Sequence, residues 1–434
     1  MKKIHLTLII LFVALSLLFI INNTHHVKST YINKLPYIIT SPGYYIINTT
    51  ATLNETAIII NSDNVILDGN GCVLKGMGNY CGIKIDNGID IKIKNLVVTG
   101  WKYGIFANGY QITLENISAY GNKYGIYALN HNGIIILNGK IYNSGIKMRD
   151  CKMFNNFYNF ALKNYDLDWD KNSNNIDISN TVNGKPIYYL VNKRNIVINK
   201  SSNVGALYLI NCKNVSIEGL NLTNNVYGIF IYGGKNISIK NSVVCFNQWG
   251  IYAYKVDNLN LKNISSYSNI VGMHFEFSNK HIENCKMFDN VFNLVIVDSI
   301  SQDFGYIKNT TVNNRLVYYL INKSNLIIDK YSNAGTIYLI NCNNITVKNL
   351  NLTNNGFGIY LINTSNSKFE NLSISNNWWG LYLTLSYNNT FKNISLISNI
   401  HDISGSKGNT FINVVNVPVS KDSRILRKYY ELFE

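Results

Sequence analysis

Short segments in which hydrophobic and polar residues alternate recur along much of the chain. Ile237-Ser-Ile239 and Leu259-Asn-Leu261 are two examples. A period of two places successive side chains on opposite faces of a β-strand. The pattern therefore predicts an all-β protein made of many short strands, whereas the C-terminal stretch from Ser423 to Glu434 has a helical pattern.

The alternating segments repeat about every 22 residues. Glycine, usually followed by isoleucine, marks this step at Gly228, Gly250 and Gly272. A leucine-rich repeat has a similar period, but its leucine pattern and helical half are absent, and propeller blades need ~40–50 residues. Coils of a β-solenoid stack as parallel strands ~4.8 Å apart, so equivalent residues lie above one another. We therefore predict a single-stranded, right-handed parallel β-helix with coils of about 22 residues.

A longer repeat indicates that a module has been duplicated. Thr181-Val-Asn183 recurs as Thr311-Val-Asn313, and the offset of 130 residues is kept by later motifs. Solenoids need capped ends, because an open coil exposes unpaired strand edges. The predicted organisation is an N-terminal cap over 31–57, a β-helix over 58–415 with the duplication over 181–300 and 311–415, and a C-terminal tail or cap over 416–434.

Asparagine also recurs at the 22-residue step. Stacked Asn side chains can hydrogen-bond from coil to coil, as they do in other stacked β arrays. We expect such a ladder to be buried and structural, so that its members in glycosylation sequons would be inaccessible to glycosylation. The ladder is predicted to contain Asn95, Asn116, Asn241, Asn263, Asn349, Asn371 and Asn393.

Aromatic residues keep the same step, two positions after the repeat glycine. The flanking isoleucines should point inward, so this column should point outward. An exposed column could bind sugar rings, since aromatic faces offer apolar area; alternatively, its rings stack on one another and only stabilise the sheet. The candidate carbohydrate-binding residues are Tyr208, Phe230, Tyr252, Tyr338, Tyr360 and Tyr382. A second column, which immediately precedes the glycine and includes Tyr227 and Trp249, is predicted to pack in the core or at a corner.

The N-terminal segment, residues 1–30, is predicted to be a signal anchor. Lys2 and Lys3 precede an apolar run from Leu6 to Ile21. A cleaved signal peptide is the alternative, although no small-residue cleavage site follows the run. In both cases the positive-inside rule places the bulk of the chain outside the cytoplasmic membrane. We expect a single-pass protein of the cell membrane with an extracellular solenoid, or a secreted protein if the segment is cleaved.

Composition and charge add little chemistry. The formal net charge is +15, but charged residues make up only 15% of the chain, against about 25% in ordinary soluble domains. The lysines are dispersed rather than gathered into a nucleic-acid patch. No nucleic-acid partner is therefore predicted, and the many Asn-x-Ser/Thr sequons are compatible with an external glycoprotein.

No catalytic cluster or cofactor motif is apparent. Asp166, Asp168 and Asp170 form the densest acidic group. Alternation would place their carboxylates on one side of a strand, so they are a weak candidate for a Ca²⁺ site, with an exposed acidic edge as the alternative. The histidines do not share a coil register, so no other metal site is predicted.

Two motifs resemble a known family. The segment from Asn64 to Gly71, Asn-Val-Ile-Leu-Asp-Gly-Asn-Gly, and the segment from Asn183 to Leu190, Asn-Gly-Lys-Pro-Ile-Tyr-Tyr-Leu, are similar to the NosD-like group. These exported right-handed β-helix proteins, of the archaeal surface-protein type, share repeats with carbohydrate-binding and sugar-hydrolase domains. The resemblance implies the fold and export. It implies the namesake's role in copper-site maturation only where metal ligands are present.

These features favour a non-catalytic, membrane-anchored rod that binds envelope polysaccharide or partner surface proteins. A polysaccharide-active lyase or hydrolase is the alternative, because this fold also carries such enzymes. A copper-delivery protein like the family namesake is the third hypothesis. The sequence does not decide whether the protein is an enzyme, but it favours a non-enzymatic role.

Overall fold

The computed structural model describes residues 29–130, 134–137, 140–143, 146–164, 174–299, 304–405 and 407–432. The predicted signal anchor lies outside these residues, except for its last two positions, and so does the acidic trio Asp166, Asp168 and Asp170. In the described part of the chain, no helix has the length and apolar character needed to cross a membrane.

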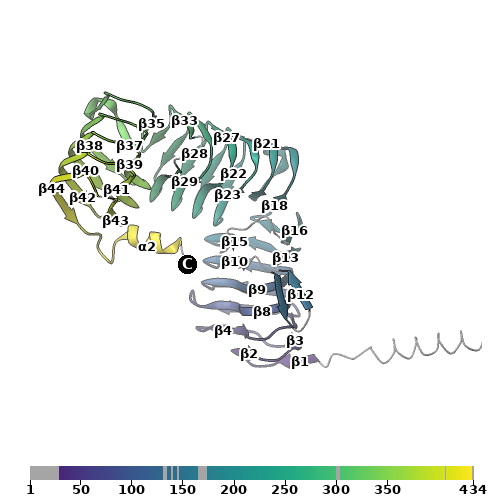
Figure 1. Ribbon diagram of the computed structural model, residues 1–434. Coiled ribbons are helices and arrows are strands. Elements are labelled where there is room, and N and C mark those ends of the chain that lie inside the picture. The colour runs from purple at the N-terminus through teal and green to yellow at the C-terminus, as the bar shows by residue number, and fades with distance from the viewer. Residues whose placement is uncertain are drawn as a thin grey trace, which may run out of the picture.

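The chain forms parallel β-coils, as predicted, but the coils are divided into three stacks (Figure 1). We call these stacks the first segment (29–182), the second segment (185–312) and the third segment (315–417). The strands of the first segment are β1 (Ser29–Ile32), β2 (Tyr37–Ile39), β3 (Gly43–Ile47), β4 (Ala51–Leu53), β5 (Ile58–Ile60), β6 (Val65–Asp68), β7 (Val73–Gly76), β8 (Cys81–Thr99), β9 (Tyr103–Tyr120), β10 (Tyr124–Asn130), β11 (Ile134–Leu137), β12 (Lys140–Asn143), β13 (Ile146–Arg149), β14 (Lys152–Phe154), β15 (Tyr158–Asn164), β16 (Asn175–Ile176) and β17 (Thr181–Val182).

The second segment keeps the 22-residue register most regularly. Phe230 pairs with Tyr208 in the coil before it and with Tyr252 in the coil after it. Its elements are β18 (Lys185–Val191), β19 (Arg194–Ile198), the 3₁₀ turn η2 (Lys200–Ser202), β20 (Ala206–Ile210), β21 (Lys213–Glu218), β22 (Asn221–Thr223), β23 (Tyr227–Tyr232), β24 (Lys235–Lys240), β25 (Val243–Cys245), β26 (Trp249–Tyr254), β27 (Asp257–Lys262), β28 (Ser265–Tyr267), β29 (Val271–Glu276), β30 (Lys280–Glu283), β31 (Lys286–Phe288), β32 (Phe292–Val297), β33 (Gly305–Lys308) and β34 (Thr311–Val312).

The third segment repeats the second and is followed by a C-terminal helix. Phe369 and Phe391 stack in its core, with ring centroids 4.6 Å apart. Its elements are β35 (Arg315–Ile321), β36 (Ile327–Ile328), the 3₁₀ turn η3 (Lys330–Ser332), β37 (Ala334–Ile340), β38 (Thr346–Thr353), β39 (Phe357–Ile362), β40 (Lys368–Ser375), β41 (Trp379–Thr384), β42 (Thr390–Ile397), β43 (His401–Ser404), β44 (Thr410–Val417) and α2 (Arg424–Glu431).

Two equivalent hairpins divide the solenoid. Strands β17 and β18 pair in the antiparallel sense around Asn183 and Gly184, and β34 and β35 do so around Asn313 and Asn314. All four turn residues have positive φ, between 47° and 75°. This is the geometry of a type I′ turn, which Asn and Gly favour. Each hairpin reverses the chain, so the next segment stacks along a new direction.

The segments meet through backbone hydrogen bonds that recur at both junctions. In the first junction, the Asn159 N–H donates to the Asn224 carbonyl (2.7 Å), and the Val226 N–H donates to Phe160 (3.2 Å). The second junction repeats this pattern between the β32 strand and the turn at 354–356. Strands β15 and β32, each at the end of a parallel sheet face, thereby satisfy polar groups that an open edge would leave unpaired.

A buried asparagine ladder exists, but it is not the predicted one. The Asn225 N–H donates to the Asn247 Oδ1 (2.9 Å), and the Asn247 N–H donates to the Asn269 Oδ1 (2.9 Å). All three side chains are buried, and those of Asn247 and Asn269 each accept a backbone N–H from the preceding coil that no strand partner satisfies. A matching buried column in the third segment includes Asn355 and Asn377.

The predicted ladder forms hydrogen bonds but lies at the surface. The Asn263 Nδ2 donates to the Asn241 Oδ1 (2.9 Å), and the Asn371 Nδ2 donates to the Asn349 Oδ1 (3.1 Å). The expectation of burial was wrong because these residues occupy left-handed turns, which point their side chains to solvent. Six of the seven are exposed and Asn95 is half-buried, so the expectation that Asn263, Asn371 and Asn393 are inaccessible is also withdrawn. The predicted ladder comprises Asn95, Asn116, Asn241, Asn263, Asn349, Asn371 and Asn393.

The helix α2 confirms the predicted helical C-terminus and packs among the three segments. The Gln248 Nε2 of the second segment donates to the Tyr124 hydroxyl of the first (2.7 Å) and to the Glu431 carbonyl of the helix (3.0 Å). Tyr429 of the helix region meets Trp378 of the third segment edge-on, with ring centroids 5.3 Å apart. Figure 1 shows α2 on the inner side of the curve that the stacks form.

Candidate functional site

The outward aromatic column has the predicted register but is mostly covered. Tyr208 is 0% exposed, because Phe160 of the first segment packs edge-on against its ring at 5.5 Å. Tyr338 donates its hydroxyl to the Leu294 carbonyl (3.2 Å). The expectation of an exposed column was therefore wrong for four of its members, since the neighbouring segments bury them. Tyr208, Phe230, Tyr338 and Tyr360 are buried, whereas Tyr252 and Tyr382 are half-buried.

The second aromatic column is largely buried in the core and also packs against the first column. Tyr227 meets Phe230 edge-on at 4.9 Å, and Trp249 meets Tyr252 edge-on at 5.6 Å. The prediction of core or corner packing is confirmed for Tyr227 and Trp249, which are buried members of the hydrophobic core, and their rings also face the outward column. Together the two columns form an apolar layer that helps to join the segments.

A groove lies beside this layer, where α2 faces the turns of the second segment. It encloses ≈ 1350 Å³, which is more than a typical small-molecule pocket. All three segments and α2 contribute to it. Its lining residues are Phe157, Tyr158, Asn224, Phe246, Ser268, Asn269, Ile270, Lys286, Phe288, Asp289, Asn290, Val291, Asn313, Asn314, Asn354, Asn376, Ser423, Arg424, Ile425 and Lys428.

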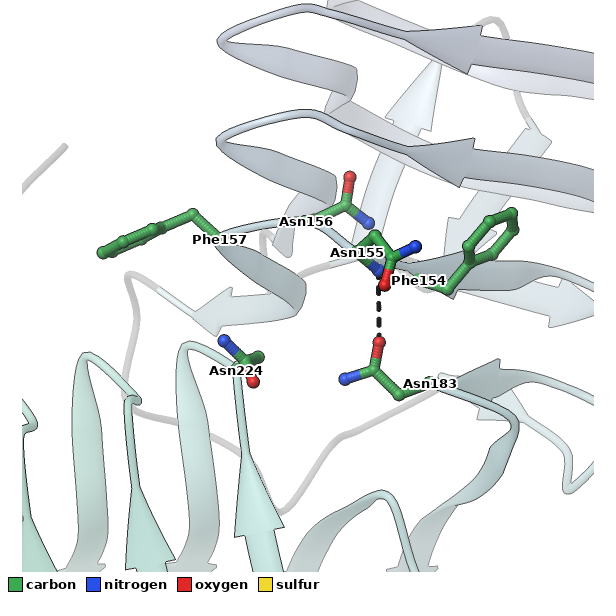
Figure 2. A pocket seen from close by; sticks show the side chains of 6 residues that line it. All are labelled: Phe154, Asn155, Asn156, Phe157, Asn183 and Asn224. Carbon is green, nitrogen blue, oxygen red and sulfur yellow. Dashed lines mark hydrogen bonds between the residues drawn. The ribbon is translucent and has the colours of Figure 1, made fainter.

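A smaller hollow of ≈ 580 Å³ continues the groove along the first junction (Figure 2). Phe157 and Asn224 line both cavities. In the hollow, the Asn155 N–H donates to the Asn183 Oδ1 (3.2 Å). Figure 2 shows the Phe157 ring projecting away from this hydrogen bond. The two cavities together make an elongated site lined by amides and aromatic rings.

The solenoid turns place the groove residues. Asn224, Phe246, Ser268 and Asp289 occupy the same turn position in successive coils, and their φ angles lie between 54° and 59°. A turn of this kind ends one short strand and redirects the chain toward the next coil. Because the coils stack in register, four turn side chains form one row on the groove.

Phe246 is the unusual member of this row. An L-residue in the left-handed region costs roughly 1–2 kcal/mol, and Asn or Asp tolerates that conformation best. A bulky residue there is an outlier. Phe246 has φ 57° and is 52% exposed. The chain therefore bears strain at this turn while keeping an aromatic ring on the groove.

Other aromatic rings lie next to Phe246 and on the opposite side of the groove. Tyr267 and Phe288 stack with centroids 5.0 Å apart, and Phe246 meets Tyr267 edge-on at 6.1 Å. Phe157, on the facing side, is 56% exposed, and the Lys428 ammonium lies 5.3 Å above its ring. The rings present flat apolar area beside amide donors and acceptors.

Cationic side chains outnumber carboxylates on the groove. Lys286, Arg424 and Lys428 line it, and Asp289 is the single carboxylate among its described lining residues. Lys428 is also paired with Glu431 at 2.8 Å. Hydrolysis of a glycosidic bond uses two carboxylates at matched separation. The described lining residues do not supply such a pair, whereas they do supply groups that bind sugars.

The cysteines carry no second site among the residues described. All seven are free thiols. Burial raises the pKa of the Cys81 thiol to about 11 and that of Cys151 to about 12, which makes both unreactive. Within the described ranges, no three His, Cys, Asp or Glu side chains gather closely enough to hold a metal ion.

Sequence reasoning did not find the groove. Its most informative signal was available, since Phe246 replaces the Asn, Ser or Asp found at the other turns of its row. The other groove residues come from different segments and from α2, and their proximity depends on the hairpins. The acidic trio Asp166, Asp168 and Asp170 lies outside the described residues, so the weak Ca²⁺ candidate stays a prediction.

Comparisons with known proteins identify the type of solenoid. Residues 299–421 match a family model described as a right-handed β-helix region. No curated protein sequence matches the chain. Three solved structures are similar at low levels. The A-module of the mannuronan C-5 epimerase AlgE6 from Azotobacter vinelandii is 12% identical, with 92% of this chain and 93% of that chain covered and a TM-score of 0.23.

The other two structures come from different kinds of protein. The catalytic unit of a GH87 α-1,3-glucanase from Streptomyces thermodiastaticus is 12% identical, with 89% of this chain and 64% of that chain covered and a TM-score of 0.20. The surface protein and adhesin PfbA of Streptococcus pneumoniae is 11% identical, with coverages of 88% and 91% and a TM-score of 0.14. The family-model match and the parallel pairing of the coils show an all-β, right-handed parallel β-solenoid of about 16 turns.

Proposed function

We propose that this protein is an exported surface solenoid that binds a polysaccharide in the groove without cleaving it. Export and membrane anchoring rest on the N-terminal apolar run from Leu6 to Ile21. The exposed sequon residues Asn263 and Asn371 support a location where glycosylation occurs. The ligand is an envelope polysaccharide rather than a small sugar, because the groove and the hollow extend over several coils.

The observation that carries the proposal is the strained, exposed Phe246. Strain at a single residue persists when the surrounding structure imposes it, and such residues cluster at functional sites. An asparagine at this turn would relieve the strain, as it does at Asn224. The aromatic ring at this position would stabilise a bound ligand, since stacking on a sugar ring buries the apolar face of the phenylalanine.

The charge on the groove favours an acidic polysaccharide over a neutral one. Lys286 and Arg424 face the groove with Asp289 as their opposing carboxylate. Guanidinium and ammonium groups form charge-assisted hydrogen bonds with sugar carboxylates. Binding should therefore weaken with added salt, because such exposed contacts are screened.

The absence of a carboxylate pair on the described groove lining favours binding without catalysis. The test uses the purified protein with an acidic and a neutral polysaccharide of similar length, and it measures both affinity and release of new chain ends. We expect affinity for the acidic polymer and no new ends. Release of new reducing or unsaturated ends would identify a hydrolase or lyase instead, and lack of binding to either polymer would reject the glycan partner.

Phe277 offers a matched control for Phe246. It is also a phenylalanine in the left-handed region, with φ 48°, and it is 39% exposed. It packs edge-on against Tyr254 at 5.9 Å, outside the groove. Replacing Phe246 by Asn should weaken polysaccharide binding, whereas replacing Phe277 by Asn should not.

A further inference from the structure

A lysine occupies an inward position of the solenoid, in a column that is otherwise apolar. In this column Val215 pairs with Ile237, Ile237 with Leu259, and Leu259 with Lys280. The Lys280 side chain is 0% exposed. The first segment has Ile146 at the equivalent position of β13. Lys280 is therefore a specific feature of the last coil of the second segment.

The partner of Lys280 is Asp298, which follows strand β32. The Lys280 Nζ lies 2.8 Å from Oδ1 and 3.0 Å from Oδ2 of this carboxylate, whose side chain is also 0% exposed. The Tyr319 hydroxyl donates to the Asp298 Oδ2 (2.7 Å), and the Lys280 Nζ lies 5.1 Å from the centroid of the Tyr319 ring. Because Tyr319 belongs to the third segment, docking of that segment completes the enclosure.

An ion pair in this setting carries a large desolvation cost. Removing a carboxylate and an ammonium from water is unfavourable, and the mutual attraction of the charges recovers this only in part. A neutral amide between the same two side chains would bury no charge. Such an amide can form only after the ammonium has given one proton to the carboxylate.

We propose that Lys280 and Asp298 join in an intramolecular isopeptide bond. The Nζ lies within 3.0 Å of both Asp298 oxygens, so a rotation of the carboxylate is enough to bring Cγ into line with the nitrogen lone pair. After proton transfer, the Nζ lone pair attacks Cγ and forms the carbon–nitrogen bond. The tetrahedral intermediate then breaks the bond from Cγ to Oδ2, and this oxygen leaves as water with the two protons that nitrogen has given up.

Tyr319 acts as a positioning residue for this step. Its hydroxyl donates a hydrogen bond to Oδ2, the oxygen that leaves. Burial raises the pKa of Tyr319 far above its ordinary range, so the hydroxyl keeps its proton. The products are a secondary amide and one water molecule, and no oxidant or cofactor takes part. The bond would fasten the final coil of the second segment at its junction with the third.

Peptide mass mapping of the full chain, expressed in bacteria without glycosylation, tests the bond directly. Trypsin cuts after Lys262, Lys280, Lys286 and Lys308. An amide on the Lys280 side chain blocks cleavage at that residue, so the bond would leave the peptide 263–286 intact and attached to the peptide 287–308. We expect the two peptides to remain joined, with a combined mass lower by one water, about 18 Da, than the sum of the separate peptides. Cleavage after Lys280, with the peptides 263–280, 281–286 and 287–308 separate and at full mass, would overturn the proposal.

Two variants and one alternative product make the test specific. Lys280→Met, which suits an apolar inward position, should abolish the joined species, and its intact mass should equal the sequence mass. Lys240→Met, at an exposed end of strand β24, should retain the intact-mass loss of one water. A loss of one water confined to the 287–308 peptide would show dehydration of Asp298 alone and would contradict the bond. The result is independent of whether the groove binds a polysaccharide.

Discussion

The substitution Phe246→Asn tests whether this phenylalanine serves polysaccharide binding or the stability of the fold. The substitution relieves a left-handed conformation, φ 57°, that costs an L-residue roughly 1–2 kcal/mol and that Asn tolerates. It also removes the edge contact with Tyr267 at 6.1 Å. An aromatic pair of this kind contributes about 0.5–1.5 kcal/mol, and solvent exposure places this one near the low end.

The net expectation is a more stable protein. The balance of these two effects is a gain of about 0.5–1.5 kcal/mol in the free energy of unfolding. For chains of 150–250 residues, 1 kcal/mol shifts the melting temperature by about 2–4 °C. In this longer chain we expect a rise of about 1–2 °C, which differential scanning calorimetry can resolve.

Polysaccharide affinity should change in the opposite direction. Loss of one aromatic stacking contact of about 0.5–1.5 kcal/mol should weaken binding by roughly 2–10-fold. Isothermal titration with an acidic polysaccharide gives this ratio. Phe277→Asn, which relieves the same kind of strain outside the groove, should raise stability without weakening binding. The reasoning is refuted if Phe246→Asn melts at a lower temperature than the unmodified protein, or if its affinity is unchanged.

Three further predictions concern the ladders and an acidic group. Asn247→Ala should destabilise the protein by about 2–3 kcal/mol, because it leaves the Asn225 N–H unsatisfied in the core. Asn263→Ala at the surface should cost less, about 1–2 kcal/mol, because alanine must then adopt the left-handed conformation of φ 55°. Chemical denaturation compares them, and a larger cost for Asn263→Ala would contradict the assignment of the buried ladder. Asn263 should carry glycan in a host that modifies sequons, since it is exposed, and an unmodified peptide in mass spectrometry would count against accessibility. Burial raises the pKa of Asp68, but hydrogen bonds, among them one from Lys94, outweigh this and lower it to about 2. Because the folded pKa lies below the unfolded value of 3.8, this stabilisation is complete above about pH 4 and is lost as the pH falls through about 2, with a magnitude on the order of 2 kcal/mol. Asp68→Asn should flatten acid unfolding in that window, and an unaltered acid transition would show that other groups govern it.

The coil register was predictable because it is a local property of the sequence. A residue that recurs every 22 positions fixes its own stacking partners, and the pairings of Phe230 with Tyr208 and Tyr252 follow the predicted step. The inward or outward direction was also predictable for strand residues. It was not predictable for the two Asn series, since both have the same period and only the turn conformation decides which amide is buried.

The division into three segments could have been predicted from one hairpin sequence, but the abundance of asparagine in the chain made that sequence inconspicuous. Asn183-Gly184 is a strong type I′ hairpin sequence, but it stands in a chain where asparagine is abundant. Once a hairpin redirects the stack, the segments cover each other's aromatic columns. Burial of Tyr208 by Phe160 is therefore a long-range consequence that a repeat pattern cannot reveal. The groove has the same origin, because α2 and three segments form it.

Hydrogen–deuterium exchange with and without an acidic polysaccharide tests the central claim most directly. The account predicts slower exchange on binding in the turns that carry Asn224, Phe246, Ser268 and Asp289, and in helix α2. The strands β37 and β39, which bear Tyr338 and Tyr360, should be unchanged, since these rings are already buried. Protection confined to coils away from the groove, or no protection at saturating ligand, would contradict a polysaccharide site at this position.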